Sequence, residues 1–192
     1  MADIPSVFPY DNPEVAVWAV KNELEMDSVT GLPNRQAGIE KLRRMLDRAK
    51  IGGDLSILFL DLDRFKPINN KYGHKYGDQI LKDCAEGIRR TFRPTDLVFR
   101  YGGDEIVVAM SDYYKDDSDQ EADRNNKEER IRNAIQDTLS MRDDYESHSE
   151  LADVGVTLGI AYYENEDTPE SIIDRADITQ YNIKHRKHTN GY

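Results

Sequence analysis

Two apolar runs that flank a pair of glycines constrain the fold most strongly. Residues 97–99 precede the glycine pair 102–103, and residues 106–110 follow it. Gly-Gly between such runs predicts a β-hairpin, because glycine accepts the positive φ that a tight turn requires. The hairpin presents Asp104 and Glu105 at one edge of a sheet, and glycines without side chains let a bulky ligand approach the backbone. Taken alone, the same turn also fits two solvated surface acids.

A second acidic motif follows the apolar run 55–60. This run, broken only by Ser56, predicts a strand buried on both faces at the centre of a sheet. Asp61 is expected where that strand ends, and Asp63 faces the same side or hydrogen-bonds the nearby loop. Mg²⁺ takes oxygen ligands, usually one or two carboxylates together with substrate phosphates. The strand and the hairpin therefore predict a site for hard cations.

Composition limits the class of protein. The chain of 192 residues fits one domain, and its net charge of −11 argues against a surface that binds nucleic acid. A nucleotide ligand is still allowed, because metal ions and a few local cations can neutralise phosphates. No apolar run approaches membrane-spanning length and no signal pattern opens the chain, so we expect a cytoplasmic protein without a membrane segment. Cys84 lies on an apolar helical stripe and is expected to be a buried structural thiol.

The remaining pattern mixes helices with strands. The expected helices cover about 12–25, the stretch from 36 to the glycines at 52–53, 78–92, a region around 131–139 and 169–184. Loops are expected at 1–11 and around 73–74, and the polar stretch 111–128 is expected to be an exposed loop that runs into a helix. Strict alternation over 154–162 predicts a strand with one buried face. The fold class that follows is α/β (α+β), with a central mixed, mainly antiparallel sheet flanked by helices.

Four motifs, in order, resemble the GGDEF domain of bacterial diguanylate cyclases over roughly residues 27–184. Residues 27–35 are similar to D-x-L-T-G-L-x-N-R, and residues 61–78 to D-x-D-x-F-K-x-x-N-D-x-x-G-H-x-x-G-D. Residues 102–106 match the signature with Ile in place of Phe, and residues 176–184 resemble A-D-x-A-L-Y-x-A-K. The resemblance implies a palm fold like that of nucleotidyl cyclases at 27–192, after an N-terminal segment and linker helix at 1–26.

The resemblance also implies an activity: condensation of two GTP molecules to cyclic di-GMP with release of two pyrophosphates. Each domain would hold one GTP, so a homodimer of facing domains is implied. Asp61, the Leu62 carbonyl and Asp104 would bind two Mg²⁺ ions, with Mn²⁺ as an alternative. Two metals stabilise the attacking and leaving oxygens of an in-line displacement. Asp104 and Glu105 would be the catalytic acids.

Substrate contacts follow from the same resemblance. The implied GTP-binding residues are Lys66, Asn69, His74, Asp78, Gly102, Gly103 and Lys184. Asn69 and Asp78 would read the guanine edge, because an amide offers donor and acceptor and a carboxylate accepts N–H groups. Asp78 could instead be a helix N-cap, Lys184 a cation favoured by the helix dipole, and Lys66 a solvated lysine. His74 is expected to pin its loop rather than to catalyse.

A product-binding site is implied as well. Arg93 and Asp96 match the family's inhibitory R-x-x-D motif, which binds intercalated cyclic di-GMP, and Arg130 stands where the family often supplies a second arginine. Arginine grips guanine edges and phosphates in a bidentate way. The alternative is an ordinary helix-to-strand turn with a local ion pair.

Departures from the family pattern keep other functions open. His188 stands where the family has a phosphate-contacting Arg, so that Arg186 or Lys187 would have to substitute. The main alternative is a degenerate GGDEF module that binds GTP or cyclic di-GMP and acts as a regulatory domain. A phosphatase of the D-x-D-x-[TV] type is disfavoured by Phe65, and an EF-hand loop by the absence of Gly five residues after Asp61.

Overall fold

The computed structural model describes residues 24–111 and 120–189. Most of the expected N-terminal helix, and residues 112–119 of the polar stretch, lie outside these ranges, whereas residues 120–128 already belong to the helix into which that stretch was expected to run. The described elements, two of them short 3₁₀ turns, are α2 (Arg35–Ala49), β1 (Leu55–Asp63), α3 (Phe65–Tyr72), α4 (His74–Arg90), β2 (Leu97–Gly102), β3 (Glu105–Ser111), α5 (Gln120–Ser140), η2 (Tyr145–Ser147), η3 (Ser149–Asp153), β4 (Gly155–Tyr162) and α6 (Pro169–Thr189). This mixture of helices with an antiparallel sheet confirms the expected α+β class.

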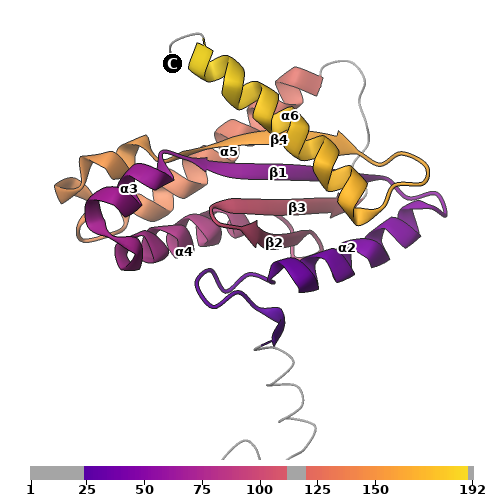
Figure 1. The fold of residues 1–192 in the computed structure, drawn as a ribbon, viewed down its shortest axis with the longest axis horizontal. Coiled ribbons are helices and arrows are strands. Elements are labelled where there is room, and N and C mark those ends of the chain that lie inside the picture. The colour runs from indigo at the N-terminus through magenta and orange to yellow at the C-terminus, as the bar shows by residue number, and fades with distance from the viewer. Residues whose placement is uncertain (1–23, 112–119, 190–192) are drawn as a thin grey trace, which may run out of the picture.

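Four strands form one sheet in the order β2-β3-β1-β4, and every described pairing is antiparallel (Figure 1). β1 lies inside the sheet, as its apolar run predicts. The pairing continues past that run, because Asp61 lies opposite Glu105 of β3 and Thr157 of β4. The expectation that Asp61 emerges where the strand ends is therefore wrong by two residues: Asp61 is held inside β1, with strands on both sides.

Helices cover both faces of the sheet (Figure 1). α2 and α6 pack on the face that includes Phe59, whereas α4 and α5 pack on the face that includes Leu58. Since side chains alternate along a strand, Asp61 and Asp63 share the face of α2 and α6. β4 contacts both α5 and α6, so the expectation of one buried face is wrong there.

The segment between β1 and β2 differs from the sequence-based expectation. A loop was expected through residues 73–74, but α3 and α4 are two helices separated only by Gly73, which has a φ of +84°. α3 has only eight residues and buries just Phe65 and Ile68 against the core, so too few apolar positions repeat for the sequence to reveal it. α4 begins at His74, so Asp78 lies inside the helix and its alternative role as N-cap is wrong.

The hairpin turn is displaced by one residue from the glycine pair. Gly102 belongs to β2 and pairs with Glu105, with a bulge between Arg100 and Gly102. The turn itself consists of Gly103 and Asp104, and Gly103 has the positive φ, +49°. Asp104 therefore lies in the turn, and Glu105 begins the next strand.

α6 approaches β4 unusually closely at Gly159. An ideal Cβ on Gly159 would lie 2.1 Å from the carbonyl oxygen of Ala176 and 2.3 Å from the backbone nitrogen of Gln180. Only a residue without a side chain allows this packing of helix backbone on strand backbone. The contact fixes the middle of α6 above the sheet, four residues before Lys184.

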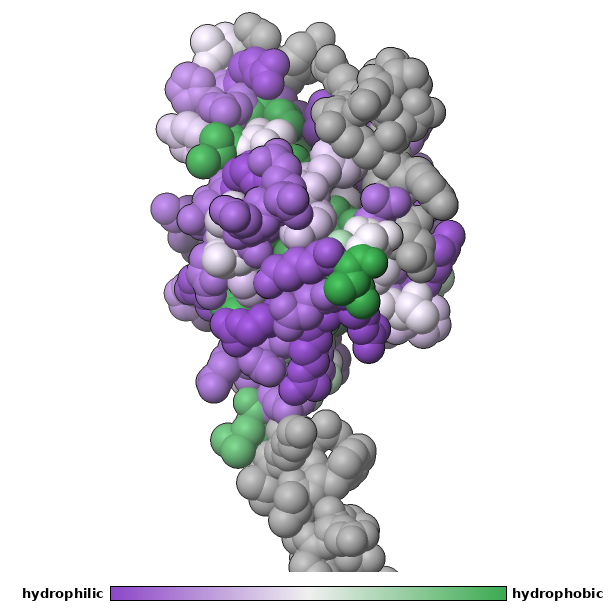
Figure 2. Space-filling view, turned by 90° about the vertical axis from the view of Figure 1, so that its right-hand side faces the viewer, coloured by the Kyte–Doolittle hydropathy of each residue, from purple (hydrophilic) through white to green (hydrophobic). Residues whose placement is uncertain are grey.

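The surface is largely hydrophilic on the side shown in Figure 2, where hydrophobic residues stand apart from one another. Within the described ranges, every helix is too short or too polar to cross a lipid bilayer.

Candidate active site

Asp61 and Asp104 meet at one end of the sheet, where the backbones of Leu62 and Asp104 are hydrogen-bonded to each other. Asp61 comes from the interior strand β1 and Asp104 from the β2–β3 turn, and the Leu62 amide donates to the Asp104 carbonyl at 3.3 Å. Glu105 is the cross-strand partner of Asp61. The structure thus brings together the three residues predicted to bind metal and the two predicted to act in catalysis.

Burial and like charge make this cluster electrostatically unfavourable without a cation. Burial raises the pKa of Asp61, and the nearby Asp104 raises it further, against the opposing effect of Lys184. Burial likewise raises the pKa of Glu105, followed by the charges of Asp61, Asp177 and Asp104. Carboxylates that repel one another in a partly buried site are stabilised by any cation that binds between them.

The cluster fits a cation that substrate helps to hold. The ammonium group of Lys184 on α6 donates to Asp61 Oδ1, so a cation already lies against the central carboxylate. Among the described residues, no set of three or more His, Cys, Asp or Glu side chains is arranged as a complete metal centre. Mg²⁺ does not require one, because it usually takes one or two carboxylates and completes its shell with water and phosphate oxygens.

The raised pKa of Glu105 predicts an unusual dependence of stability on pH. The folded protein binds this proton more tightly than the unfolded chain, so stability falls as pH rises from about 4 through the raised pKa. Glu105→Gln should therefore leave Tm unchanged near pH 4 and raise it by about 2 °C at pH 7, measured by calorimetry in EDTA. Glu129→Gln, at an exposed residue of α5, serves as the control. A lower Tm for Glu105→Gln at pH 7 would contradict the prediction.

Arg100 holds the β2–β3 turn in place. Its Nε and Nη2 donate to the Gly103 carbonyl at 3.0 and 2.7 Å, and its Nη1 donates to both carboxylate oxygens of Asp27 at 2.9 and 3.0 Å. Burial alone would raise the pKa of Asp27, but hydrogen bonds from Thr30 and Arg100 lower it. The sequence reasoning missed Arg100 because its partner lies 73 residues away.

The two residues predicted to read guanine lie close together. Asn69 on α3 points at Gly77 of α4, where an ideal Cβ would lie 1.8 Å from Asn69 Oδ1. Asp78 follows Gly77 directly and is exposed, and Lys66 and His74 are exposed on the same pair of helices. Glycine at position 77 therefore lets the Asn69 side chain lie against α4, beside the residue that precedes Asp78.

The last turns of α6 hold two lysines in the site. Lys184 contacts Asp61, and Lys187 donates to Glu128 of α5 at 2.6 Å and to Thr157 of β4 at 3.1 Å. Thr157 in turn donates to Asp63 at 2.9 and 3.0 Å, so the partner of Asp63 is a strand residue rather than the nearby loop. Arg186 instead donates to the Asn182 carbonyl of its own helix.

The residues predicted to bind product lie around the end of α4 and on α5. The Arg93 amide donates to Asp96 Oδ2 at 2.9 Å, so Asp96 closes the helix-to-strand turn through the backbone rather than by an ion pair with the guanidinium group. The Arg93 and Arg130 side chains are exposed, and α5, which carries Arg130, packs against α4.

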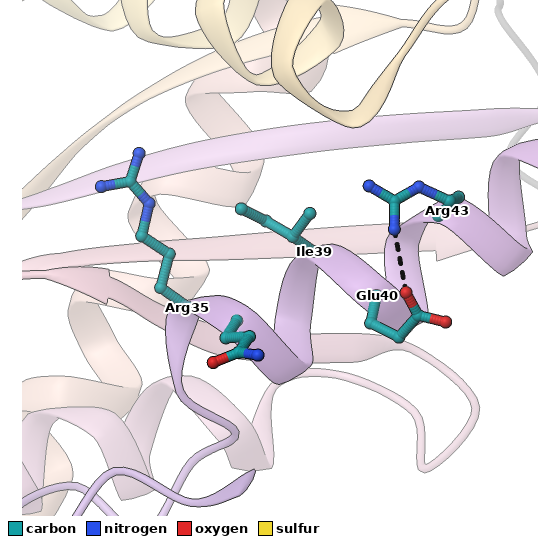
Figure 3. Close-up of a pocket in the computed structure, with 5 residues that line it drawn as sticks. Arg35, Ile39, Glu40 and Arg43 are labelled. Carbon is teal, nitrogen blue, oxygen red and sulfur yellow. Dashed lines mark hydrogen bonds and ion pairs between the residues drawn. The ribbon is translucent and has the colours of Figure 1, made fainter.

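A groove lies along α2 (Figure 3). Its volume is about 550 Å³, and it is lined by Arg35, Gln36, Ile39, Glu40 and Arg43. The guanidinium group of Arg35 stacks 4.1 Å from the centre of the Tyr101 ring and donates to the Tyr101 hydroxyl at 2.8 Å. The positive charge of Arg35 lowers the pKa of Glu105, against the larger effect of burial. Arg35 therefore lies near enough to the acidic cluster to interact with it electrostatically.

Comparisons with known proteins match this arrangement. The model of the family "Diguanylate cyclase, GGDEF domain" matches residues 24–190. The chain is 35% identical to the response regulator PleD of Caulobacter vibrioides over 161 residues, which are 82% of the chain and 33% of PleD. It is also 35% identical to the diguanylate cyclase DgcP of Pseudomonas aeruginosa over 159 residues, which are 82% of the chain and 22% of DgcP. The chain therefore spans a third or less of these relatives.

A solved structure shows the same fold. The coiled coil and GGDEF domain of DgcB from Caulobacter crescentus, in complex with c-di-GMP, superposes with a TM-score of 0.76 at 26% identity. The match covers 90% of this chain and 87% of that one.

Proposed function

The chain belongs to the GGDEF domain family of diguanylate cyclases, and from this premise we propose that it condenses two GTP molecules into cyclic di-GMP and two pyrophosphates. The observation that carries the proposal is the cluster of Asp61, Asp104 and Glu105, which two strands and a turn hold together beside Lys184. The closely set Asn69 and Asp78 support guanine as the base.

The reaction forms one O–P bond and breaks another at each phosphorus. The 3′-hydroxyl of each GTP attacks the α-phosphorus of the other, its proton leaves, and pyrophosphate departs. Asp61, the Leu62 carbonyl and Asp104 would hold two Mg²⁺ ions, which supply Lewis-acid stabilisation of the transferring phosphate. Glu105 lies opposite Asp61 in the strand pair and would accept the proton of the attacking hydroxyl. Lys184 binds the phosphates once Asp61 is neutralised.

The site of one chain offers one set of these residues, so two chains must face each other for two GTP molecules to react. We therefore include a homodimer in the proposal. The exposed Arg93 and Arg130 support a second role for cyclic di-GMP as a feedback inhibitor bound away from the acidic cluster.

The tail of α6 supports a second candidate, a module that binds GTP or cyclic di-GMP without turnover. Arg186 bonds its own helix and Lys187 bonds Glu128, so neither side chain is directed to a second phosphate contact. The acids Asp61, Asp104 and Glu105 are all present, and they favour the enzyme.

Incubation with GTP and Mg²⁺, followed by chromatography, tests the proposal. Cyclic di-GMP should form, and the rate per chain should rise with protein concentration because two chains are needed. Bound GTP without product, even at the highest protein concentration, would overturn the cyclase and leave the binding module.

A further inference from the structure

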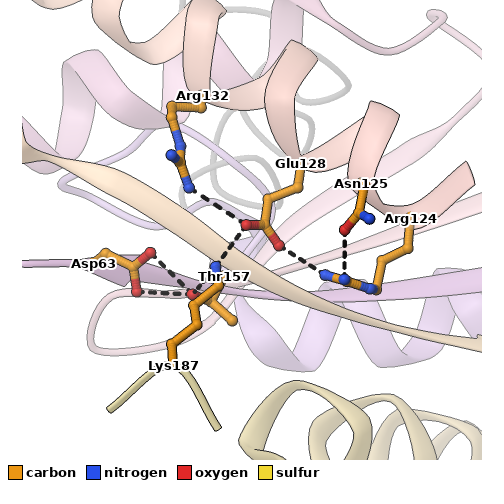
Figure 4. A network of polar contacts seen from close by, with 7 residues as sticks. All are labelled: Asp63, Arg124, Asn125, Glu128, Arg132, Thr157 and Lys187. Carbon is orange, nitrogen blue, oxygen red and sulfur yellow. Dashed lines mark hydrogen bonds and ion pairs between the residues drawn. The ribbon is translucent and has the colours of Figure 1, made fainter. Parts of the chain in front are cut away.

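A polar network crosses the edge of the sheet between α5 and α6 (Figure 4). Lys187 of α6 contacts both Glu128 of α5 and Thr157 of the edge strand β4. Thr157 is fully buried, lies opposite Asp61 in the sheet and donates to Asp63. We call Glu128, Lys187 and Thr157 the edge brace.

The edge brace differs from an ordinary surface ion pair. Glu128 is only 8% exposed, and it also accepts hydrogen bonds from Arg124 at 3.0 Å and Arg132 at 3.4 Å. Exposed ion pairs contribute little to stability, whereas a buried carboxylate must be fully paired and leaves its partners few alternative positions. Three cations on two helices therefore fix Glu128, and Glu128 in turn fixes the end of the Lys187 side chain.

The position of Lys187 on α6 connects this network to the acidic cluster. Lys184 and Lys187 are three residues apart, so they lie on the same face of the helix. α6 is held at Gly159 on one side of Lys184 and at the edge brace on the other. Beyond Lys184, the brace joins the end of α6 to α5 and to β4.

We propose that the edge brace positions Lys184 above Asp61 and thereby sets the affinity of the site for nucleotide phosphates. Glu128 and Lys187 are then positioning residues, on α5 and on the end of α6, that do not themselves touch the nucleotide. This inference rests on the proposed binding of GTP.

The test compares the wild type with Lys187→Met, Glu128→Gln and the conservative Lys187→Arg. Arg186→Met and Glu129→Gln are matched controls, because each alters the neighbouring exposed residue on the same helix. Affinity for 3′-deoxy-GTP, which lacks the attacking hydroxyl, is measured by titration calorimetry with Mg²⁺, alongside kcat and KM for GTP. Tm is recorded for every variant.

Lys187→Met and Glu128→Gln should each raise Kd and KM about 10-fold with kcat within about two-fold, because the loss concerns ground-state binding of phosphate. The double variant should resemble either single one, since both remove the same contact. Lys187→Arg should stay near the wild type, and both controls should match it.

Two results would overturn the inference. Equal Kd values for Lys187→Met and Arg186→Met would show that the brace does not affect the site. An unchanged or lower Kd for Glu128→Gln would show that Lys187, once released, binds phosphate itself. If the wild type binds 3′-deoxy-GTP but forms no cyclic di-GMP from GTP, only the proposed activity is overturned. The comparison of Kd values among the variants still tests the brace.

Discussion

Replacing Asp61 by Asn should reduce kcat/KM for cyclic di-GMP formation by at least about 10³-fold, because the proposed central metal ligand of the phosphoryl-transfer site is lost. Asn keeps the shape of the side chain but removes the charge that lies between Glu105 and Lys184. Product formation is measured by chromatography with saturating Mg²⁺, and Asp104→Asn should behave similarly.

The matched control for this prediction is Asp54→Asn. Asp54 is exposed and directly precedes β1, at the far end of the strand from Asp61. It should retain wild-type activity. An Asp61→Asn variant with more than about a tenth of the wild-type rate would contradict the assigned ligand role.

Gly159→Ala should be the most damaging small substitution for stability, with a loss of about 3 kcal/mol. The added methyl group would lie 2.1 Å from the Ala176 carbonyl, so the backbone of α6 must move away from β4. Tm should fall by about 8 °C in thermal unfolding followed by circular dichroism. Activity should fall too, because Lys184 moves with the helix.

Gly155→Ala is the control on the same strand. A Cβ at Gly155 meets its nearest atom, Arg132 Nε, at 3.5 Å, which is ordinary van der Waals contact. Its Tm should stay within about 2 °C of the wild type. If both variants unfold at the same temperature, close packing at Gly159 is not what holds α6 in place.

The fold class and the acidic cluster could be predicted because local patterns encode them. The run 55–60 identified the interior strand, and the glycine pair identified the hairpin. The exact turn could not be located, because the bulge beside Arg100 moves it by one residue. The assignments of metal, base and product contacts stay predictions, although the structure brings Asp61, Asp104 and Glu105 together and places Asn69 against Gly77, the neighbour of Asp78.

Polar contacts between residues far apart in the sequence could not be predicted from local patterns. Lys187 and Glu128 lie 59 residues apart, and nothing in either neighbourhood indicates the other. α3 was also missed, because a helix of eight residues that buries only Phe65 and Ile68 is too short to give a recognisable repeat. On β4, Thr157 and Gly159 alternate with apolar residues, which predicts that they face solvent. In the structure Thr157 is buried, and Gly159 packs against the backbone of α6.

Arg100 donates hydrogen bonds to two segments of the chain at once. Asp27 lies near the start of the described chain, and one guanidinium group joins its carboxylate to the carbonyl of Gly103. Residue 27 and the β2–β3 turn are therefore linked directly by two sets of hydrogen bonds. The position of Asp104 in that turn is coupled to Asp27 as well as to the sheet on which it lies.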